Sequence, residues 1–93
     1  MAIVIVKNAV KGEYNPDIPS GYYSWLDYWE KHTKLTAGLC RCCRKEMPNK
    51  DLVGGHVKSI SSGIIYITPL CAGCNHPDNT YTFSVESEHL VKV

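Results

Sequence analysis

Cys40-Arg41-Cys42-Cys43 and Cys71-Ala72-Gly73-Cys74 are the two stretches that decide the fold of this 93-residue chain. Each stretch contains a pair of cysteines with two residues between them. That spacing lets a tight turn aim two sulfurs at one ion while backbone N–H groups point at the thiolates, and two such pairs complete the tetrahedron that zinc prefers. We therefore predict one structural Zn2+ ion with four cysteine ligands, which are Cys40, Cys43, Cys71 and Cys74.

The 27 residues between the two pairs, 44–70, exceed the usual gap of about 15–20, and a β-hairpin inserted there would fill it. A redox-active disulfide between Cys71 and Cys74 is the competing interpretation, but the sequence lacks the thioredoxin-like βαβ pattern that it needs. Cys42 is left over, because a pair with Cys40 would have an unusual C-x-C spacing. We expect Cys42 to be a free thiol.

Composition and length indicate one ordinary globular domain. Hydrophobic residues make up 44% of the chain and charged residues 20%, a balance that excludes a disordered protein. The longest apolar run, residues 2–6, is too short to span a bilayer and lacks the basic region and cleavage site of a signal peptide. We therefore expect a cytoplasmic protein, in a reducing compartment where cysteines seldom form disulfides.

The pattern along the chain predicts an α+β domain. β-branched apolar residues predict a strand over 2–6, buried on both faces. Two further strands are expected over 52–58 and 64–68, joined by a turn, and another over 81–85. Residues 90–93 are either a short edge strand or a tail, and the sequence leaves the pairing of the terminal strands open.

An aromatic face predicts one helix over about 22–34. The residues that form this face recur at helical spacing: Tyr22, Trp25, Leu26, Trp29 and Thr33. Such a face is more typical of core packing than of a platform on which nucleic-acid bases stack, so we expect the helix to cover the zinc-binding part. Ser20 and Ser24 are both candidate N-caps, and Gly38 is the expected exit.

The net charge of +1 hides a basic middle segment, because residues 31–58 carry seven basic side chains against two acidic ones. Binding of one Zn2+ by four thiolates would add −2 and leave a net charge of −1. That total argues against strong nonspecific binding to DNA. A solvated charged face is the alternative interpretation of the segment. The cations that could contact phosphates are Arg41, Arg44, Lys45 and Lys58.

We call each C-x2-C pair with its turn a knuckle. The first knuckle is followed by a hairpin and then by the second knuckle, which opens a helix or a turn. This order resembles a treble-clef zinc finger. The motifs Cys40-x2-Cys43, Gly55-His56-Val57 and Tyr66-Ile67-Thr68-Pro69-Leu70-Cys71-x2-Cys74-Asn75 resemble the zinc-containing HNH endonucleases. Over residues 22–75 the chain also resembles small bacterial proteins of unknown function that combine a Ser-Trp-Leu helix with a Val-Gly-x-His-Val strand. This second resemblance is the closer one and implies no known activity.

These resemblances imply a single zinc-binding domain over residues 1–93. Its treble-clef core would occupy 39–79. Residues 1–38 would supply the N-terminal strand, a loop and the aromatic-rich helix, and residues 80–93 would supply the C-terminal strand and tail.

The resemblance to HNH endonucleases implies roles for His56 and Asn75. In those enzymes a histidine on the first hairpin strand is the general base, and a histidine or asparagine after the second knuckle holds a catalytic divalent metal. His56 and Asn75 match these two positions. Gly55 stands where a metal-binding acid or histidine should precede the base, and Tyr66 replaces the asparagine that fixes it. The resemblance therefore implies a scaffold that has kept its zinc and lost its chemistry.

Several interpretations stay open at the sequence level. His56 is a structural histidine beside the zinc site, a remnant base or phosphate contact, or a zinc ligand in place of a cysteine. The first function is a noncatalytic module that binds a protein, or binds nucleic acid through Arg41, Arg44, Lys45 and Lys58. The alternative is a divergent metal-dependent HNH-type endonuclease that uses His56, and a purely structural or assembly protein is the third.

Overall fold

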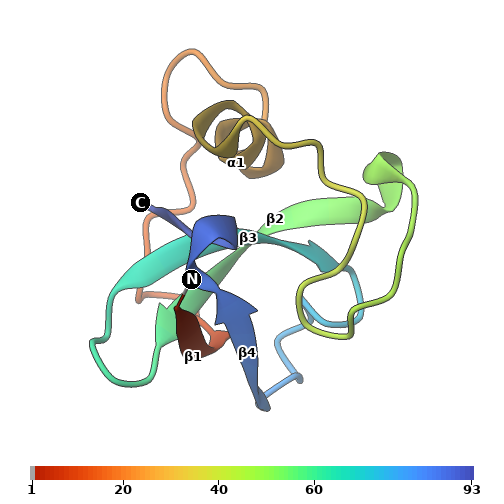
Figure 1. Ribbon diagram of the computed structural model, residues 1–93. Coiled ribbons are helices and arrows are strands. Elements are labelled where there is room, and N and C mark those ends of the chain that lie inside the picture. The colour runs from red at the N-terminus through yellow and green to blue at the C-terminus, as the bar shows by residue number, and fades with distance from the viewer. Residues whose placement is uncertain (1) are drawn as a thin grey trace.

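The computed structural model describes residues 2–93 and shows, within them, one α-helix and a five-stranded antiparallel sheet (Figure 1). The strands lie in the order β4-β1-β2-β3-β5 across the sheet. The elements are β1 (Ile3–Asn8), α1 (Trp25–Thr33), β2 (Leu52–Ser59), β3 (Ile65–Cys71), β4 (Thr82–Glu86) and β5 (Val91–Lys92). Two single 3-10 turns, η1 (Asn49–Asp51) and η2 (Ser87–His89), precede β2 and β5. The predicted α+β class is confirmed, and no helix of the described residues is long and apolar enough to cross a membrane.

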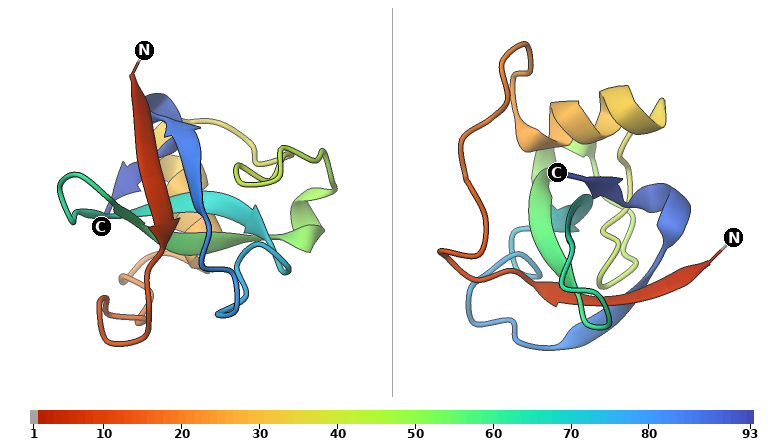
Figure 2. Two further views of the ribbon diagram at one scale, coloured as in Figure 1. Left: turned by 90° about the horizontal axis from the view of Figure 1, so that it is seen from below. Right: turned by 90° about the vertical axis from the view of Figure 1, so that its left-hand side faces the viewer.

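Helix α1 lies over β2 and β3, whereas β1 and β4 run side by side at a distance from it (Figure 2). Leu26 and Trp29 are its buried residues, and Trp29 is only 1% exposed. The indole Nε1 of Trp29 donates to the carbonyl oxygen of His89 at 2.9 Å, so the polar atom of this side chain is also satisfied. Full burial of a large apolar side chain stabilises a fold by roughly 1.5–3 kcal/mol. The prediction of core packing for this residue is confirmed.

Strand β1 lies between β2 and β4, with one face open to solvent. Val6 is fully buried, whereas Ile3 and Ile5 are 57% and 47% exposed. The prediction that this strand is buried on both faces was wrong, because an antiparallel sheet needs only one covered face. The pairing of the terminal strands is now defined. β1 pairs with β4 over Ile3↔Glu86 to Lys7↔Thr82, and β5 pairs with β3.

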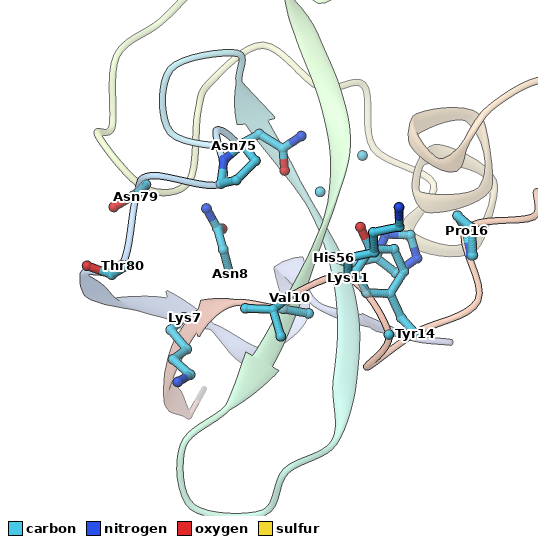
Figure 3. A pocket seen from close by; sticks show the side chains of 15 residues that line it. Lys7, Asn8, Val10, Lys11, Tyr14, Pro16, His56, Asn75, Asn79 and Thr80 are labelled. Carbon is cyan, nitrogen blue, oxygen red and sulfur yellow. The ribbon is translucent and has the colours of Figure 1, made fainter.

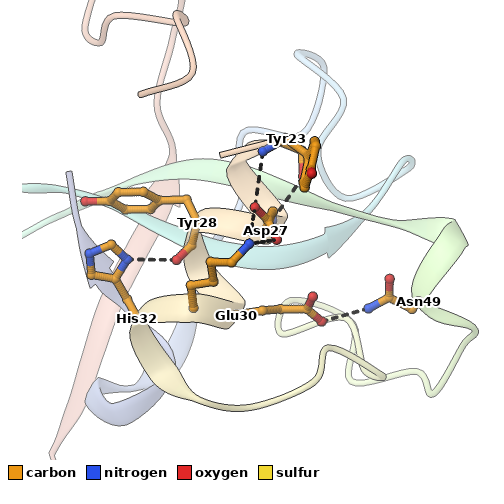
Figure 4. Close-up of polar contacts among 8 residues, drawn as sticks. Tyr23, Asp27, Tyr28, Glu30, His32 and Asn49 are labelled. Atoms are coloured by element: carbon orange, nitrogen blue, oxygen red, sulfur yellow. Dashed lines mark hydrogen bonds and ion pairs between the residues drawn. The ribbon is translucent and has the colours of Figure 1, made fainter. Parts of the chain in front are cut away.

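The helix begins later than predicted, with Ser24 rather than Ser20 as its N-cap. The Oγ of Ser24 accepts a hydrogen bond from the Asp27 N–H at 3.0 Å. The Asp27 carboxylate in turn accepts from the Tyr23 N–H at 3.1 Å (Figure 4). These two bonds satisfy backbone donors at the first turn, and the acidic side chain also suits the positive end of the helix dipole.

The helix ends at Lys34, whose φ of 65° is left-handed, so the predicted exit at Gly38 was wrong. The Lys34 N–H closes the last turn on the Glu30 carbonyl oxygen at 2.9 Å. The Glu30 carboxylate then fastens the following loop, because Oε2 accepts from the Ala37 N–H at 2.7 Å and from Asn49 Nδ2 at 2.9 Å (Figure 4). This loop carries the first cysteine pair.

Helix and sheet approach most closely at Gly54 on β2. A Cβ added at Gly54 would lie 2.5 Å from the Leu26 nitrogen and 2.5 Å from the Trp25 carbonyl carbon, so only glycine fits there. The start of α1 therefore sits directly on β2. This contact sets the position of Trp25 beside His56, two residues along the strand from Gly54.

Strands β2 and β3 form the predicted hairpin, paired from Leu52↔Cys71 to Lys58↔Ile65. β3 runs on to Cys71, so the second cysteine pair starts at the end of a strand. Residues 72–78 that follow are turns and a bend. Of the two alternatives for the second knuckle, helix or turn, the structure has the turn. The helix that a treble clef carries at this point is therefore not formed in residues 72–78.

Candidate metal centre and adjoining pocket

Four cysteine sulfurs converge between the loop that follows α1 and the end of β3. The Sγ atoms of Cys40, Cys43, Cys71 and Cys74 all lie within 4.8 Å of one another. Four thiolates at about 2.3 Å from a tetrahedral ion would have their sulfurs roughly 3.8 Å apart, so the cluster has the dimensions of a metal site. The four residues identified from the sequence are thus brought together by the fold and could bind a metal ion.

The first knuckle is shaped by its backbone. Arg44 has a left-handed φ of 65°, its N–H donates to the Cys40 carbonyl oxygen at 2.8 Å, and the Cys40 N–H donates to Lys45 O at 3.0 Å. The Arg41 N–H donates to the carbonyl oxygen of Pro69 on β3 at 2.9 Å. This last bond ties the first knuckle to the strand that leads into the second, so the two cysteine pairs meet.

The sulfurs influence one another's ionisation. Burial raises the pKa of Cys40, but backbone N–H groups of Cys43, Cys71 and Cys42 donate toward its sulfur and bring the pKa down to about 7. Burial raises the pKa of Cys74, and the neighbouring Cys42, Cys71 and Cys40 side chains raise it further. One thiolate thus opposes the ionisation of the next. A bound divalent cation reverses that opposition, because a coordinating thiol is deprotonated outright.

Two residues considered as ligands lie outside the group of four sulfurs. Cys42 is not a member of it, as expected of the leftover thiol. Its Sγ lies 3.9 Å from Asn79 Nδ2, which also donates to the Cys74 carbonyl oxygen at 2.7 Å. His56 is not a member either, so its interpretation as a zinc ligand receives no support from the geometry.

Two of the four cations expected to contact phosphates are held in ion pairs. Arg44 Nη1 lies 3.1 Å from Glu86 Oε1, and Nη2 donates to the Ser84 carbonyl oxygen at 2.7 Å. Lys58 pairs with Glu13.

The other two predicted cations differ in their surroundings. The Nε of Arg41 is buried without a hydrogen-bond partner, and burial lowers the pKa of its guanidinium. Lys45 is exposed. The basic segment is therefore less available than its charge count suggests.

A pocket of about 710 Å3 lies beside the second knuckle (Figure 3). We call it the His56 pocket. Its lining comes from three separate parts of the chain: residues 7–16, residues 54–56 and residues 75–80. His56 from β2 and Asn75 from the second knuckle both line it. The two residues that the HNH resemblance singles out are thus brought to one cavity.

His56 is packed between two aromatic rings. Its imidazole is stacked on Tyr14, with ring centroids 3.9 Å apart and planes inclined by 15°, and meets Trp25 edge to face at 4.7 Å. The residue is 8% exposed, and its Nε2 is buried without a hydrogen-bond partner. Burial lowers the pKa of His56 to about 4, so the ring is neutral at pH 7. Of the three interpretations of His56, the structural histidine fits this packing between Tyr14 and Trp25 best.

The space next to Gly55 is filled by two other side chains. A Cβ added at Gly55 would lie 2.5 Å from Leu70 Cδ1 and 2.7 Å from Asn75 Oδ1. An acidic side chain or a histidine at this position therefore has no room unless Leu70 and Asn75 move. Gly55 lies in a wall of the pocket, and the absence of a side chain there leaves no empty space, because Leu70 and Asn75 fill it.

Sequence reasoning missed two residues that build the pocket. Tyr14 falls between the predicted strand over 2–6 and the predicted helix, and Asn8 lies beyond the predicted end of that strand, so neither was considered as part of a site. The Asn8 Nδ2 donates to the Cys74 carbonyl oxygen at 2.6 Å, a contact between residues 66 positions apart in the chain. Neither residue belongs to a recognisable motif, and such long-range contacts leave no local signal in the sequence.

Comparisons with known proteins do not assign the chain to a family: no family model matches it, and no curated protein or solved structure matches it either.

Proposed function

We propose that this chain is a small domain structured by one Zn2+ ion and that it acts as a noncatalytic binding module. The observation that carries this proposal is the convergence of four cysteine sulfurs within 4.8 Å. Four thiolates leave no open coordination position, which is the arrangement of structural rather than catalytic zinc sites. Zinc is the ion proposed because a tetrahedral all-sulfur site in a small domain suits it best.

The packing at Gly55 supports the noncatalytic part of the proposal. An HNH-type reaction needs a second metal beside the base, and Leu70 and Asn75 occupy the space of the side chain that would hold it. His56 is enclosed by Tyr14 and Trp25. A domain with this arrangement keeps the scaffold that resembles a nuclease and uses it for binding.

The proposed macromolecular partner is a protein or a nucleic acid. The ion pairs of Arg44 with Glu86 and of Lys58 with Glu13 favour a protein, because contacts with phosphates would have to compete with those carboxylates. Lys45, which is exposed and outside these ion pairs, would provide the basic contact if nucleic acid is bound. In that case affinity falls steeply as salt rises, since each phosphate contact releases counterions. Binding that is insensitive to salt indicates a protein partner.

A divergent HNH-type endonuclease is the second candidate, and one observation favours it. His56 and Asn75 line the same pocket, and a neutral imidazole is the form that a general base needs. The test is plasmid nicking in magnesium or manganese by the wild type and by His56→Ala. Nicking that is lost with His56→Ala supports the nuclease, and nicking that persists in this variant points to a contaminant.

The structural role of the metal is tested by native mass spectrometry and far-UV circular dichroism on the same sample, before and after chelation. One bound zinc that is lost together with the fold supports the proposal. A folded protein without any metal contradicts it.

A further inference from the structure

The walls of the His56 pocket are held in a fixed shape next to the metal centre. Asn8 Nδ2 and Asn79 Nδ2 both donate to the Cys74 carbonyl oxygen, at 2.6 and 2.7 Å. These two bonds fasten β1 and the segment after the second knuckle to a metal-ligating residue. The pocket volume of about 710 Å3 is in the range of cavities that hold small organic ligands. The pocket is therefore large enough for a ligand, and two of its walls are held in place by hydrogen bonds to Cys74.

The charge of the pocket is one-sided. Lys7 and Lys11 line it, and its other lining residues include no aspartate or glutamate. Glu13 lies nearby, but both oxygens of its carboxylate are engaged: Oε1 accepts from the Val10 N–H at 2.8 Å, and Oε2 pairs with Lys58. An anionic group is therefore the complement of this cavity.

The rest of the lining is largely apolar, and two buried side-chain atoms of lining residues, Asn8 Oδ1 and His56 Nε2, have no hydrogen-bond partner. Val10, Pro16 and the ring of Tyr14 lie in the wall, and Lys7 and His56 lie at opposite ends of the cavity in the view of Figure 3. His56 is more than nine-tenths buried, and its Nε2 has no hydrogen-bond partner. This unpaired nitrogen costs free energy, and its burial keeps it out of reach of a ligand unless a neighbouring side chain moves.

We propose that the His56 pocket binds a small organic acid, with its apolar body against Tyr14 and Val10 and its anionic head beside Lys7 or Lys11, which lie at different ends of the cavity (Figure 3). This goes beyond the binding of a macromolecule, because the cavity is enclosed by three chain segments and is sized for a small molecule. A polar atom on the body of the acid meets the amide of Asn75. The neutral amide of the same acid would fill the cavity equally well and lack the attraction to the two lysines.

The test uses the metal-loaded full chain, 15N-labelled, with three probes: 2-naphthoate, 4-phenylbutyrate and octanoate. Amide shift changes are followed by NMR, and affinities of the acids and of 2-naphthamide are measured by calorimetry. We expect at least one acid to shift residues 7–14, His56 and residues 75–80. We also expect 2-naphthoate to bind roughly tenfold more tightly than 2-naphthamide. The double variant Lys7→Gln/Lys11→Gln should lose that tenfold preference and leave the affinity of the amide unchanged. Lys50→Gln, which removes a charge outside the pocket, is the matched control and should bind as the wild type does.

Several outcomes would overturn the proposal. These are an absence of shifts from all three acids at millimolar concentration, shifts confined to residues outside the pocket, and equal binding of acid and amide. Inorganic phosphate or adenosine monophosphate that binds at these residues more tightly than every acid also overturns it, in favour of phosphate recognition. A result of this kind leaves the zinc proposal intact, because the metal is measured separately by mass.

Discussion

The side chain of Asn75 fills the space that a side chain at position 55 would need: a Cβ added at Gly55 would lie 2.7 Å from Asn75 Oδ1. Leu70 Cδ1 closes the same space at 2.5 Å. A side chain at position 55, one of the two positions that would hold a catalytic metal in an HNH-type site, therefore fits only if Leu70 and Asn75 move. Whatever the pocket binds, Gly55 leaves the space that Leu70 and Asn75 occupy, and Asn75 contributes its amide.

We expect Gly55→Ala to destabilise the domain by about 1–3 kcal/mol, because the added methyl group overlaps Leu70 and Asn75. The matched control is Gly38→Ala, since no atom lies within 4 Å of a Cβ added at Gly38. That substitution should change the free energy of unfolding by less than about 0.5 kcal/mol. Urea denaturation of the metal-loaded proteins measures both. Equal stability of the two variants would show that the wall yields easily.

Removal of the metal should unfold the domain. The binding free energy of a structural zinc site is folding free energy, on the order of 10–16 kcal/mol in zinc-finger peptides, which exceeds the usual stability of a small domain. Cys71→Ser should therefore have the same effect as a chelator, whereas Cys42→Ser should keep both the metal and the fold, because Cys42 lies outside the group of sulfurs. Native mass spectrometry and circular dichroism report the two properties. Loss of metal in Cys42→Ser would make that residue a ligand.

His56 should make stability depend on pH below neutrality. Burial lowers the pKa of the folded-state imidazole to about 4, from 6.5 in an ordinary environment. Between these values the unfolded chain binds a proton that the folded chain excludes. The contribution of neutral His56 is therefore fully present above pH 6.5 and declines as the pH falls towards 4.

The measurement is an NMR titration of the His56 ring in the folded, metal-loaded protein, joined to urea denaturation at about pH 7.5 and 5.5. Because acid also weakens metal binding by protonating thiolates, the decisive quantity is the difference between the wild type and His56→Gln. The wild type should lose more stability than the variant. A ring that titrates near its ordinary pKa of 6.5 would contradict the burial seen here.

The sequence predicted the parts of this molecule that depend on short spacings. The C-x2-C pairs, the hairpin of β2 and β3 and the aromatic helix each carry a local pattern, and each is present. The open face of β1 could not be predicted, because residues 2–6 are all apolar and show no alternation. The end of the helix near residue 34 was predicted, but its exit was assigned to Gly38 because a left-handed lysine is uncommon and a glycine stands four residues further on.

The pocket was invisible to sequence reasoning for a different reason. Its walls come from residues 7–16, 54–56 and 75–80, and these meet only because β1 crosses to pair with β2 and β4. The ion pairs of Arg44 and Lys58 are contacts of the same kind, 42 and 45 residues apart in the chain. A count of charges in the middle segment cannot include partners that the fold brings from elsewhere.

The pairing of Arg44 with Glu86 gives a test of the nucleic-acid alternative. Arg44 Nη1 lies 3.1 Å from Glu86 Oε1, while the bond from Nη2 to the Ser84 carbonyl oxygen keeps the guanidinium in place. Glu86→Gln should therefore free the cation without displacing it. If the basic segment binds nucleic acid, affinity for a DNA duplex at low salt should rise by up to roughly fivefold, since an exposed ion pair is worth about 0.2–1 kcal/mol.

The control for that experiment is Asp17→Asn, which changes the net charge by the same amount in an exposed loop. Because long-range attraction depends on total charge, a contact through Arg44 is indicated only by a larger effect of Glu86→Gln than of Asp17→Asn. Fluorescence anisotropy with a labelled duplex at two salt concentrations measures the affinities. Equal effects of the two substitutions would indicate general charge attraction. Absence of binding in all three proteins would exclude the basic segment as a nucleic-acid surface and leave a protein as the partner of the proposed module.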